Sequence, residues 1–196
     1  MSGKRKQLDE RRSELVAAAR AVAMSDGLEQ LTGRKVAAKA GLSSGLVFFH
    51  FETREALLEA VLDSLIEDIF GGLTTPEGAG TPEQRLLSFL QQRFERLRTE
   101  RRQVELFIDF WVLGLRNASI RKRIRAGLER YRDAVRPVGD ELARTRSGLT
   151  GDGLAQLAVS FILGSALQFA MEPGRPDPEA LVGSVRGLLF PQGKKA

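Results

Sequence analysis

The sequence predicts an all-α fold in two helical parts, and three observations carry that prediction. Apolar residues recur at helical spacing through nearly all of the 196 residues, whereas no segment alternates with period two over a useful length. The composition, 42% hydrophobic and 28% charged, is that of a globular chain. The clearest linker is "GGLTTPEGAGTP" from Gly71 to Pro82, rich in glycine, proline and threonine. We therefore expect an N-terminal domain of residues 1–62 and a C-terminal domain of residues 63–196.

The composition also excludes several kinds of chemistry. Cysteine is absent, which removes disulfides and thiol catalysis, and with a single histidine a zinc site is not expected. No metal, cofactor or catalytic residue is predicted. No apolar run approaches about 18 residues, so we expect no membrane span. The N-terminus "MSGKRKQLDERR" is basic but lacks the apolar segment of a secretory signal, so we expect a cytoplasmic protein.

Positive charge is concentrated at the start of the chain. The net charge is +5, and residues 1–50 hold nine basic against five acidic residues. Such an excess fits a nucleic-acid partner. The alternative is a solvated basic surface without a specific partner.

Four helices are expected in the first 70 residues. An apolar stripe over Leu15–Ala23 marks the first, and Gly27 suits a left-handed cap at its end. The second covers residues 33–41. Side-chain oxygens that can cap the following helices stand at Thr32, at Ser43 or Ser44, and at Thr53.

Residues 33–52 fit a helix-turn-helix. The small Ala37 stands where two helices would cross, Gly41 suits the turn four positions later, and Val47 supplies an inward apolar residue six positions after that. The alternative is an ordinary helical hairpin.

The second helix of this motif has an apolar patch on its outer face. If Val47 and Phe51 point inward, then Gly45, Leu46, Phe49 and His50 point outward, with Ser44 and Phe48 on a flank. A patch of this kind indicates a partner, and in a helix-turn-helix that partner is the DNA major groove.

The C-terminal part reads as five long helices. They cover about residues 82–99, 103–116, 119–144, 151–171 and 178–190, with Pro137 as a kink or break in the third. The helix over 103–116 is apolar on two faces and is therefore expected to be central. Its Asp109 must then pair with an internal arginine or face a polar cavity.

The surplus apolar surface of the last two helices predicts a two-fold, four-helix dimer interface. The residues expected in it are Leu163, Ala166, Ala170, Leu181, Val185 and Leu188.

The stretch "LTGRKVAAKAGLSSGLVFFHFETREALLEAVL" resembles the DNA-binding segment of the tetracycline-repressor (TetR) family of bacterial regulators. The match covers about residues 10–62, and the ending of the chain is similar in style to the betaine-regulator-like subgroup. The resemblance implies a homodimeric repressor that binds a palindromic operator and is released by a small apolar or aromatic effector. It implies DNA contacts by Thr32, Arg34, Lys35, Ser43, Ser44, Gly45, Leu46, Phe48, Phe49, His50 and Arg54. It also implies a small-molecule pocket, for which the candidates are Phe107, Asp109, Phe110, Trp111, Tyr131, Phe161 and Gln168; the alternative is that these aromatic residues only fill the core.

The sequence departs from the family pattern in the second helix of the helix-turn-helix. Phe48 and Phe49 stand where the family often has tyrosine, so no hydroxyl is available for a phosphate. We expect Phe48 to pack against the domain core or a sugar edge, and Phe49 and Leu46 to face thymine methyl groups. His50 is expected beside a phosphate or as a satisfied residue at the helix end. Arg54 is expected to reach a phosphate or to pair near Glu55.

Two interpretations from other classes remain at this point. The first is a helical enzyme, although no nucleophile and base stand at a useful spacing. The second is an interaction scaffold without DNA binding.

Overall fold

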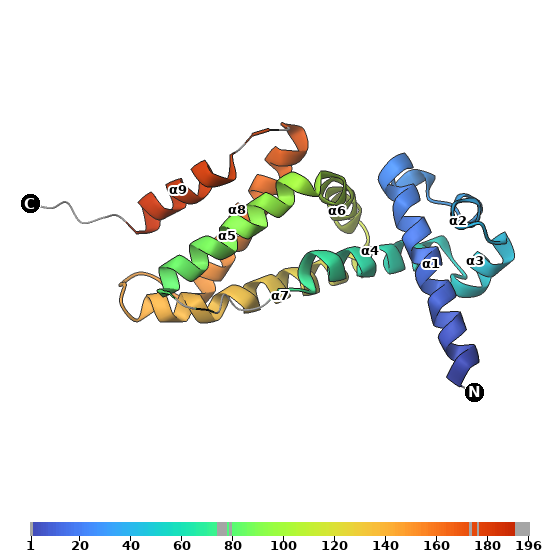
Figure 1. Cartoon of the computed structure of the whole chain (residues 1–196), viewed down its shortest axis with the longest axis horizontal. Coiled ribbons are helices and arrows are strands. Elements are labelled where there is room, and N and C mark those ends of the chain that lie inside the picture. Colours follow the sequence, from blue (N-terminus) through green and yellow to red (C-terminus); the bar gives the residue numbers. More distant parts are fainter. Residues whose placement is uncertain (1, 74–77, 79, 173, 176, 191–196) are drawn as a thin grey trace, which may run out of the picture. The chain divides into compact units, whose positions relative to one another are not determined.

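The computed structural model describes residues 2–73, 78, 80–172, 174–175 and 177–190, with side chains from Lys6 onward. These residues form nine α-helices and one short 3₁₀ helix, and no strand occurs among them (Figure 1). The prediction of an all-α fold is confirmed.

Contacts between residues divide the chain into two compact units. The first comprises the residues up to Gly71 together with Glu105–Ile124, and the second comprises Gly72–Val104 together with the residues from Arg125 onward. Helices α6 (Arg101–Gly114) and α7 (Ala118–Ala143) therefore contribute to both units. The boundary after residue 62 stays a prediction; it falls inside a continuous helix. Five of the twelve residues of the predicted linker, 74–77 and 79, lie outside the described residues.

The first unit begins with the long helix α1 (Ser2–Asp26) and the 3₁₀ turn η1 (Leu28–Gln30). Three helices follow, α2 (Gly33–Ala40), α3 (Ser44–His50) and α4 (Arg54–Phe70). Helix α1 packs against α2 and α4, and α2 packs against α3 (Figure 1). The core between them contains Leu15, Ala19, Leu31, Val36 and Val61, all without exposed surface.

Local signals fix where these helices start. The side-chain oxygens of Thr32, Ser43 and Thr53 each accept a hydrogen bond from the backbone N–H three residues later, at 3.3, 3.2 and 3.0 Å. Of the two serines considered for α3, Ser43 is therefore the cap. Gly41 adopts the left-handed conformation expected of the turn, with φ 66° and ψ 30°.

In the second unit, α5 (Pro82–Thr99) packs against α8 (Gly151–Met171) and α9 (Pro178–Leu189). The bounds of α5 and α8 agree with the sequence prediction, and α9 ends one residue earlier. Contrary to the expectation from the sequence, α8 is long and apolar enough to cross a membrane by length and composition; half of its most apolar window is buried within the protein, as in a core helix.

Two expectations about α6 and α7 were wrong. Helix α6 starts two residues earlier than predicted, directly after Glu100 closes α5. Pro137 does not break α7, since the helix runs through it for 26 residues, and the kink that we considered there stays a prediction. Proline removes one N–H bond, but Val135 and Val138 on either side are completely buried, and their packing holds the helical path.

Glycines bring α7 and α8 close together. A Cβ atom on Gly139 would lie 2.9 Å from the Cα atom of Gly151. The two backbones can therefore approach here only because neither residue has a side chain.

Candidate nucleic-acid interface

Helix α3 has one buried side and one exposed side. Val47 and the following Phe51 are buried, with 2% and 4% of their surface exposed, whereas Phe48 and Phe49 are 71% and 67% exposed. Phe48 therefore does not pack against the domain core, and contact with a sugar edge, the other setting that we considered, stays a prediction. A seven-residue helix here buries only one of its own residues, and both rings stand on its solvent face.

Two contacts set the orientation of α3. The guanidinium of Arg12 lies 5.2 Å from the centre of the Phe51 ring, a cation–π arrangement between α1 and the end of α3. At the start of α2, a Cβ atom on Gly33 would lie 3.6 Å from Val47 Cγ1. The buried side of α3 is thus held by α1 and α2, and the opposite side is left to solvent.

The N-terminal end of α3 is small and polar. Ser43, Ser44 and Gly45 are exposed, while Leu46 is half-buried. The Ser43 oxygen accepts from Leu46 N, and the Thr32 oxygen accepts from Lys35 N at the start of α2. A hydroxyl that accepts such a bond keeps its own hydrogen to donate. Each of the two hydroxyls can therefore cap its helix and donate a hydrogen bond to a phosphate at the same time.

The basic residues around this surface fall into two groups. Arg34 and Lys39 are exposed and form no hydrogen bond or salt bridge with another described residue. Lys35 differs, because its Nζ atom donates to Asp26 Oδ2 at 2.8 Å and to Gln30 Oε1 at 3.3 Å. The hydrogen bond from Lys35, with a smaller one from Ser25, holds the pKa of Asp26 below its ordinary value.

Arg54, at the start of α4, bonds backbone rather than the neighbourhood of Glu55. Its Nε atom donates to the carbonyl of Leu31 at 3.2 Å and its Nη2 atom to that of Leu28 at 2.7 Å. Leu28 is the first residue of η1, and its carbonyl also accepts from Leu31 N at 3.2 Å, whereas Leu31 directly follows the turn. The guanidinium thus joins α4 to the segment that leads into α2.

His50 is the last residue of α3 and is half-buried. The centre of its ring lies 5.2 Å from that of Phe49, edge to face, and 6.4 Å from that of Phe51. Its Nε2 atom is buried and has no hydrogen-bond partner among the described residues. His50 is therefore not the satisfied helix-end residue that we considered.

The sequence interpretation missed a polar connection between α4 and the beginning of α7. Arg123 donates to Glu59 at 2.9 Å and to Asp63 at 2.9 Å, and Ser119 also donates to Glu59. Glu59 and Asp63 are four residues apart and so share one face of α4. That spacing is the signal that could have found them.

Four of the predicted pocket residues lie on α6 in the first unit. Phe107 and Phe110 are buried, and the Phe107 ring contacts Phe70 at 5.7 Å and Trp111 at 6.2 Å. Asp109 meets neither predicted setting, since its side chain is exposed and no arginine bonds it. Partial desolvation, and then the charge of Glu105, raise the pKa of Asp109. Helix α6 is also not buried on all sides, because Val112 is more than half exposed, as is Leu115 just after the end of the helix.

The other three predicted pocket residues belong to the second unit. Tyr131 is buried, its ring contacts Phe89 at 6.0 Å, and burial raises its pKa to about 12. Phe161 contacts Phe94 at 5.6 Å and borders an apolar cavity of about 130 Å³ between α5, α8 and α9. Gln168 is exposed and points away from this interior. Of the three, only Phe161 borders this cavity, and Tyr131 is packed in the core beside Phe89.

The predicted dimer residues divide in a similar way. Ala166, Ala170 and Val185 are each 8% exposed and are covered within the protomer, so they do not form its outer face. Leu163 and Leu181 are half-buried, and Leu188 is 82% exposed. Both sides of these helices are apolar, and periodicity alone cannot tell which side a neighbour covers. The exposed apolar residues, which we call the α8–α9 face, are Leu157, Leu167, Met171 and Leu188.

Small residues accompany the α8–α9 face. Gly164 on α8, and Gly183 and Gly187 on α9, have open space where a Cβ atom would lie. Another helix can therefore approach this face closely.

Comparisons with known proteins agree with this arrangement. Residues 15–61 match the model of bacterial regulatory proteins of the tetR family, and residues 82–189 match that of the C-terminal part of BetI-type transcriptional repressors. The HTH-type transcriptional regulator BetI of Cronobacter sakazakii is 24% identical over 172 residues, which cover 84% of this chain and 85% of the relative.

Solved structures share the fold. A transcriptional regulator of Pseudomonas aeruginosa PAO1 superposes with a TM-score of 0.80 at 19% identity, covering 92% of this chain and 89% of the other. A transcriptional regulator of Saccharomonospora viridis in complex with choline has a TM-score of 0.72 at 15% identity, covering 92% and 96%.

A capped helix-turn-helix followed by a second helical unit, with these matches, defines a transcriptional regulator and not an enzyme. The chain belongs to the TetR family. Its C-terminal part is of the BetI type, so it is a BetI-type transcriptional repressor. Regulators of this family bind DNA and small-molecule effectors, which sets aside both the enzyme and the scaffold interpretation.

Proposed function

We propose that the protein binds a palindromic operator as a homodimer, with α3 of each subunit in the major groove. The observation that carries this proposal is the pair of exposed rings, Phe48 and Phe49, on a short helix whose other side is buried. A single protomer leaves this surface uncovered, and a helix-turn-helix presents its second helix to the groove.

Recognition of bases by this helix is largely apolar. The outward residues of α3 include no asparagine, glutamine or arginine, the side chains that most often read base edges through hydrogen bonds. Phe49 and Leu46 are suited to thymine methyl groups. Groove shape at neighbouring base steps supplies the remaining discrimination.

Binding to the phosphates rests first on Arg34 and Lys39, which form no salt bridge with a described carboxylate. The hydroxyls of Thr32, Ser43 and Ser44 can each donate to a phosphate oxygen. Lys35 and Arg54 already bond within the protein, and contribute to the field around the site more than to individual phosphate bonds.

The homodimer is proposed to form through the α8–α9 face. Four large apolar residues are exposed there, and the open glycines of both helices permit close approach. Isologous contact of this face with a second copy gives two reading helices related by a two-fold axis, and hence a palindromic site.

The effector is proposed to be a small molecule with an apolar or aromatic body that lowers operator affinity. The aromatic pairs of the second unit, Phe89 with Tyr131 and Phe94 with Phe161, favour such a body. The choline complex of a structural neighbour makes a quaternary ammonium compound the second candidate. We place the protein in the cytoplasm, where its DNA is.

Selection from random duplexes tests this function. The purified protein should enrich one sequence with two inverted half-sites whose centres are about one helical turn apart or a multiple of that. Affinity for it should fall steeply with salt. Enrichment of no sequence, or of a single unrepeated half-site, would contradict the operator part of the proposal.

A further inference from the structure

One arginine of α5 differs from the other three in its partners. Arg85 pairs with Glu141, Arg96 with Glu100 at 2.8 Å, and Arg98 with Glu95 at 3.0 Å. Arg93 forms no salt bridge with any described residue. Its charge is therefore not neutralised within the described part of the protein.

Arg93 lies among aromatic side chains in the second unit. Its guanidinium carbon is 5.5 Å from the centre of the Phe89 ring, and that ring contacts Tyr131 of α7 edge to face at 6.0 Å. Burial raises the pKa of Tyr131, and the charge of Arg93 acts against that rise. The guanidinium thus lies over Phe89 and near enough to Tyr131 to act on its hydroxyl, and the two residues are only 7% and 6% exposed.

The Nε atom of Arg93 is buried and has no hydrogen-bond partner among the described residues. Nε and the adjacent Nη form the side of a guanidinium that binds the two oxygens of a carboxylate in parallel. A buried donor on a charged group is costly to leave unbonded, so an acceptor at this position would be held strongly.

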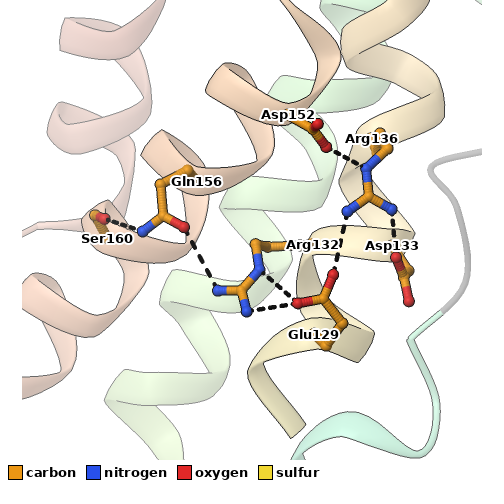
Figure 2. A network of polar contacts seen from close by, with 7 residues as sticks. All are labelled: Glu129, Arg132, Asp133, Arg136, Asp152, Gln156 and Ser160. Atoms are coloured by element: carbon orange, nitrogen blue, oxygen red, sulfur yellow. Dashed lines mark hydrogen bonds and ion pairs between the residues drawn. The ribbon is translucent and has the colours of Figure 1, made fainter. Parts of the chain in front are cut away.

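The carboxylates nearest to Tyr131 in sequence form ion pairs with arginines other than Arg93. Figure 2 shows Glu129 bonded to both Arg132 and Arg136, and Asp133 bonded to Arg136, which also reaches Asp152 of α8. Of these ion pairs, Arg136 with Asp152 connects α7 to α8, and the others lie within α7. They leave no described acid of this stretch of α7 to neutralise Arg93.

We propose that Arg93 is the anion-binding residue of the effector site, and that the effector is an organic carboxylate with an apolar or aromatic body. Its carboxylate binds Nε and Nη of Arg93, and its body packs against Phe89 and Tyr131. A quaternary ammonium compound is disfavoured here, because the guanidinium occupies the ring face that would attract it. That the carboxylate acts as an effector rests on the proposed function, whereas its binding to Arg93 does not.

Matched pairs of compounds test the proposal on the full-length protein. The probes are benzoate, phenylacetate, octanoate and laurate, each with its neutral amide, and choline as the cation. Calorimetry should find at least one acid that binds at least about tenfold more tightly than its amide, as expected for a charge-assisted pair. In Arg93→Gln this preference should vanish, and in Arg93→Lys part of it should remain.

Arg98→Gln is the control, since it removes an exposed arginine of the same helix that already has a carboxylate partner. It should leave the preference unchanged. Thermal unfolding of Arg93→Gln and Arg93→Lys checks that each is folded. The proposal is overturned if none of the four acids binds, if acid and amide bind equally, or if folded Arg93→Gln keeps the preference.

Operator binding measured without any probe keeps the two proposals separate. Arg93→Gln should bind the operator like the unmodified protein. A protein that prefers the acids but does not bind an operator would contradict the proposed function alone.

Discussion

Two exposed apolar surfaces of the protein differ in what surrounds them. Near Phe48 and Phe49 of α3 are capping hydroxyls and the cations Arg34 and Lys39, which form no salt bridge with a described residue. On the α8–α9 face, leucines and a methionine alternate with open glycines, over two helices and without a comparable cluster of cations.

The difference indicates which partner each surface fits. A few apolar groups within a positive field suit a duplex, where phosphates supply affinity and base edges supply specificity. A longer apolar face with small residues suits another helix pair, because burial and close packing supply the free energy. Exposed hydrophobicity alone would not have distinguished the two.

The largest effect is expected from a charge on the α8–α9 face. Leu167 is half exposed, and Leu167→Glu would bury a carboxylate in each copy of the interface, close to its symmetry mate. Light scattering should change from twice the chain mass to the chain mass of 21.6 kDa. Operator affinity should fall by more than about 100-fold, since one reading helix alone is left. Gln92→Glu, on the exposed side of α5, is the control and should stay dimeric.

Truncation of one ring on α3 should weaken specific binding next. Phe49→Ala is expected to cost about 1–3 kcal/mol on the selected operator and much less on random DNA, with the salt dependence unchanged. Fluorescence anisotropy on the two duplexes makes the comparison. Equal losses on both would mean that Phe49 supports the domain and does not read the groove.

Arg54→Ala should lower the free energy of unfolding, as measured without DNA. It removes two hydrogen bonds from a charged donor to the carbonyls of Leu28 and Leu31. We expect a loss of about 1.5–3 kcal/mol in the free energy of unfolding, measured by denaturant titration without DNA. Unchanged stability with weakened DNA binding would instead make Arg54 a phosphate ligand.

Arg34→Ala removes an arginine of the same surface that, unlike Arg54, has no partner among the described residues. The substitution should therefore leave the unfolding free energy within about 0.5 kcal/mol. Binding should weaken on every sequence, and the slope of log K against log salt should become shallower by about one. A loss confined to the operator would contradict a phosphate role.

The smallest effect is expected from Phe48→Tyr. Phe48 is 71% exposed, so a hydroxyl can be added without disturbing the core. If it reaches a phosphate, operator affinity should rise by about 0.5–1.5 kcal/mol, with no change in stability. A loss of affinity would place the ring against an apolar part of the groove.

Features set by neighbouring residues were predictable from the sequence. Thr32, Gly41 and Thr53 act through atoms only a few positions away, and α5 and α8 have the bounds that their patterns indicate. The division of α3 into inward Val47 and outward Phe49 follows from the same short-range geometry.

Features set by distant neighbours were not predictable. Pro137 continues a helix because packing outweighs one missing bond, and Val185 is covered because α9 happens to lie against α5 on that side. The isolation of Arg93 depends on which carboxylates its neighbours have already used. Single-sequence periodicity holds no information on any of these.

Helix α4 is attached to its neighbours at two points along its length. At its first turn the helix is fastened to η1 and to Leu31, one residue before the cap of α2, and farther along Glu59 and Asp63 are fastened to Arg123. Through these contacts α4 links the start of α7 to the segment that enters α2. The helix is thus a physical route by which a rearrangement at Arg123 could be transmitted toward α2 and α3.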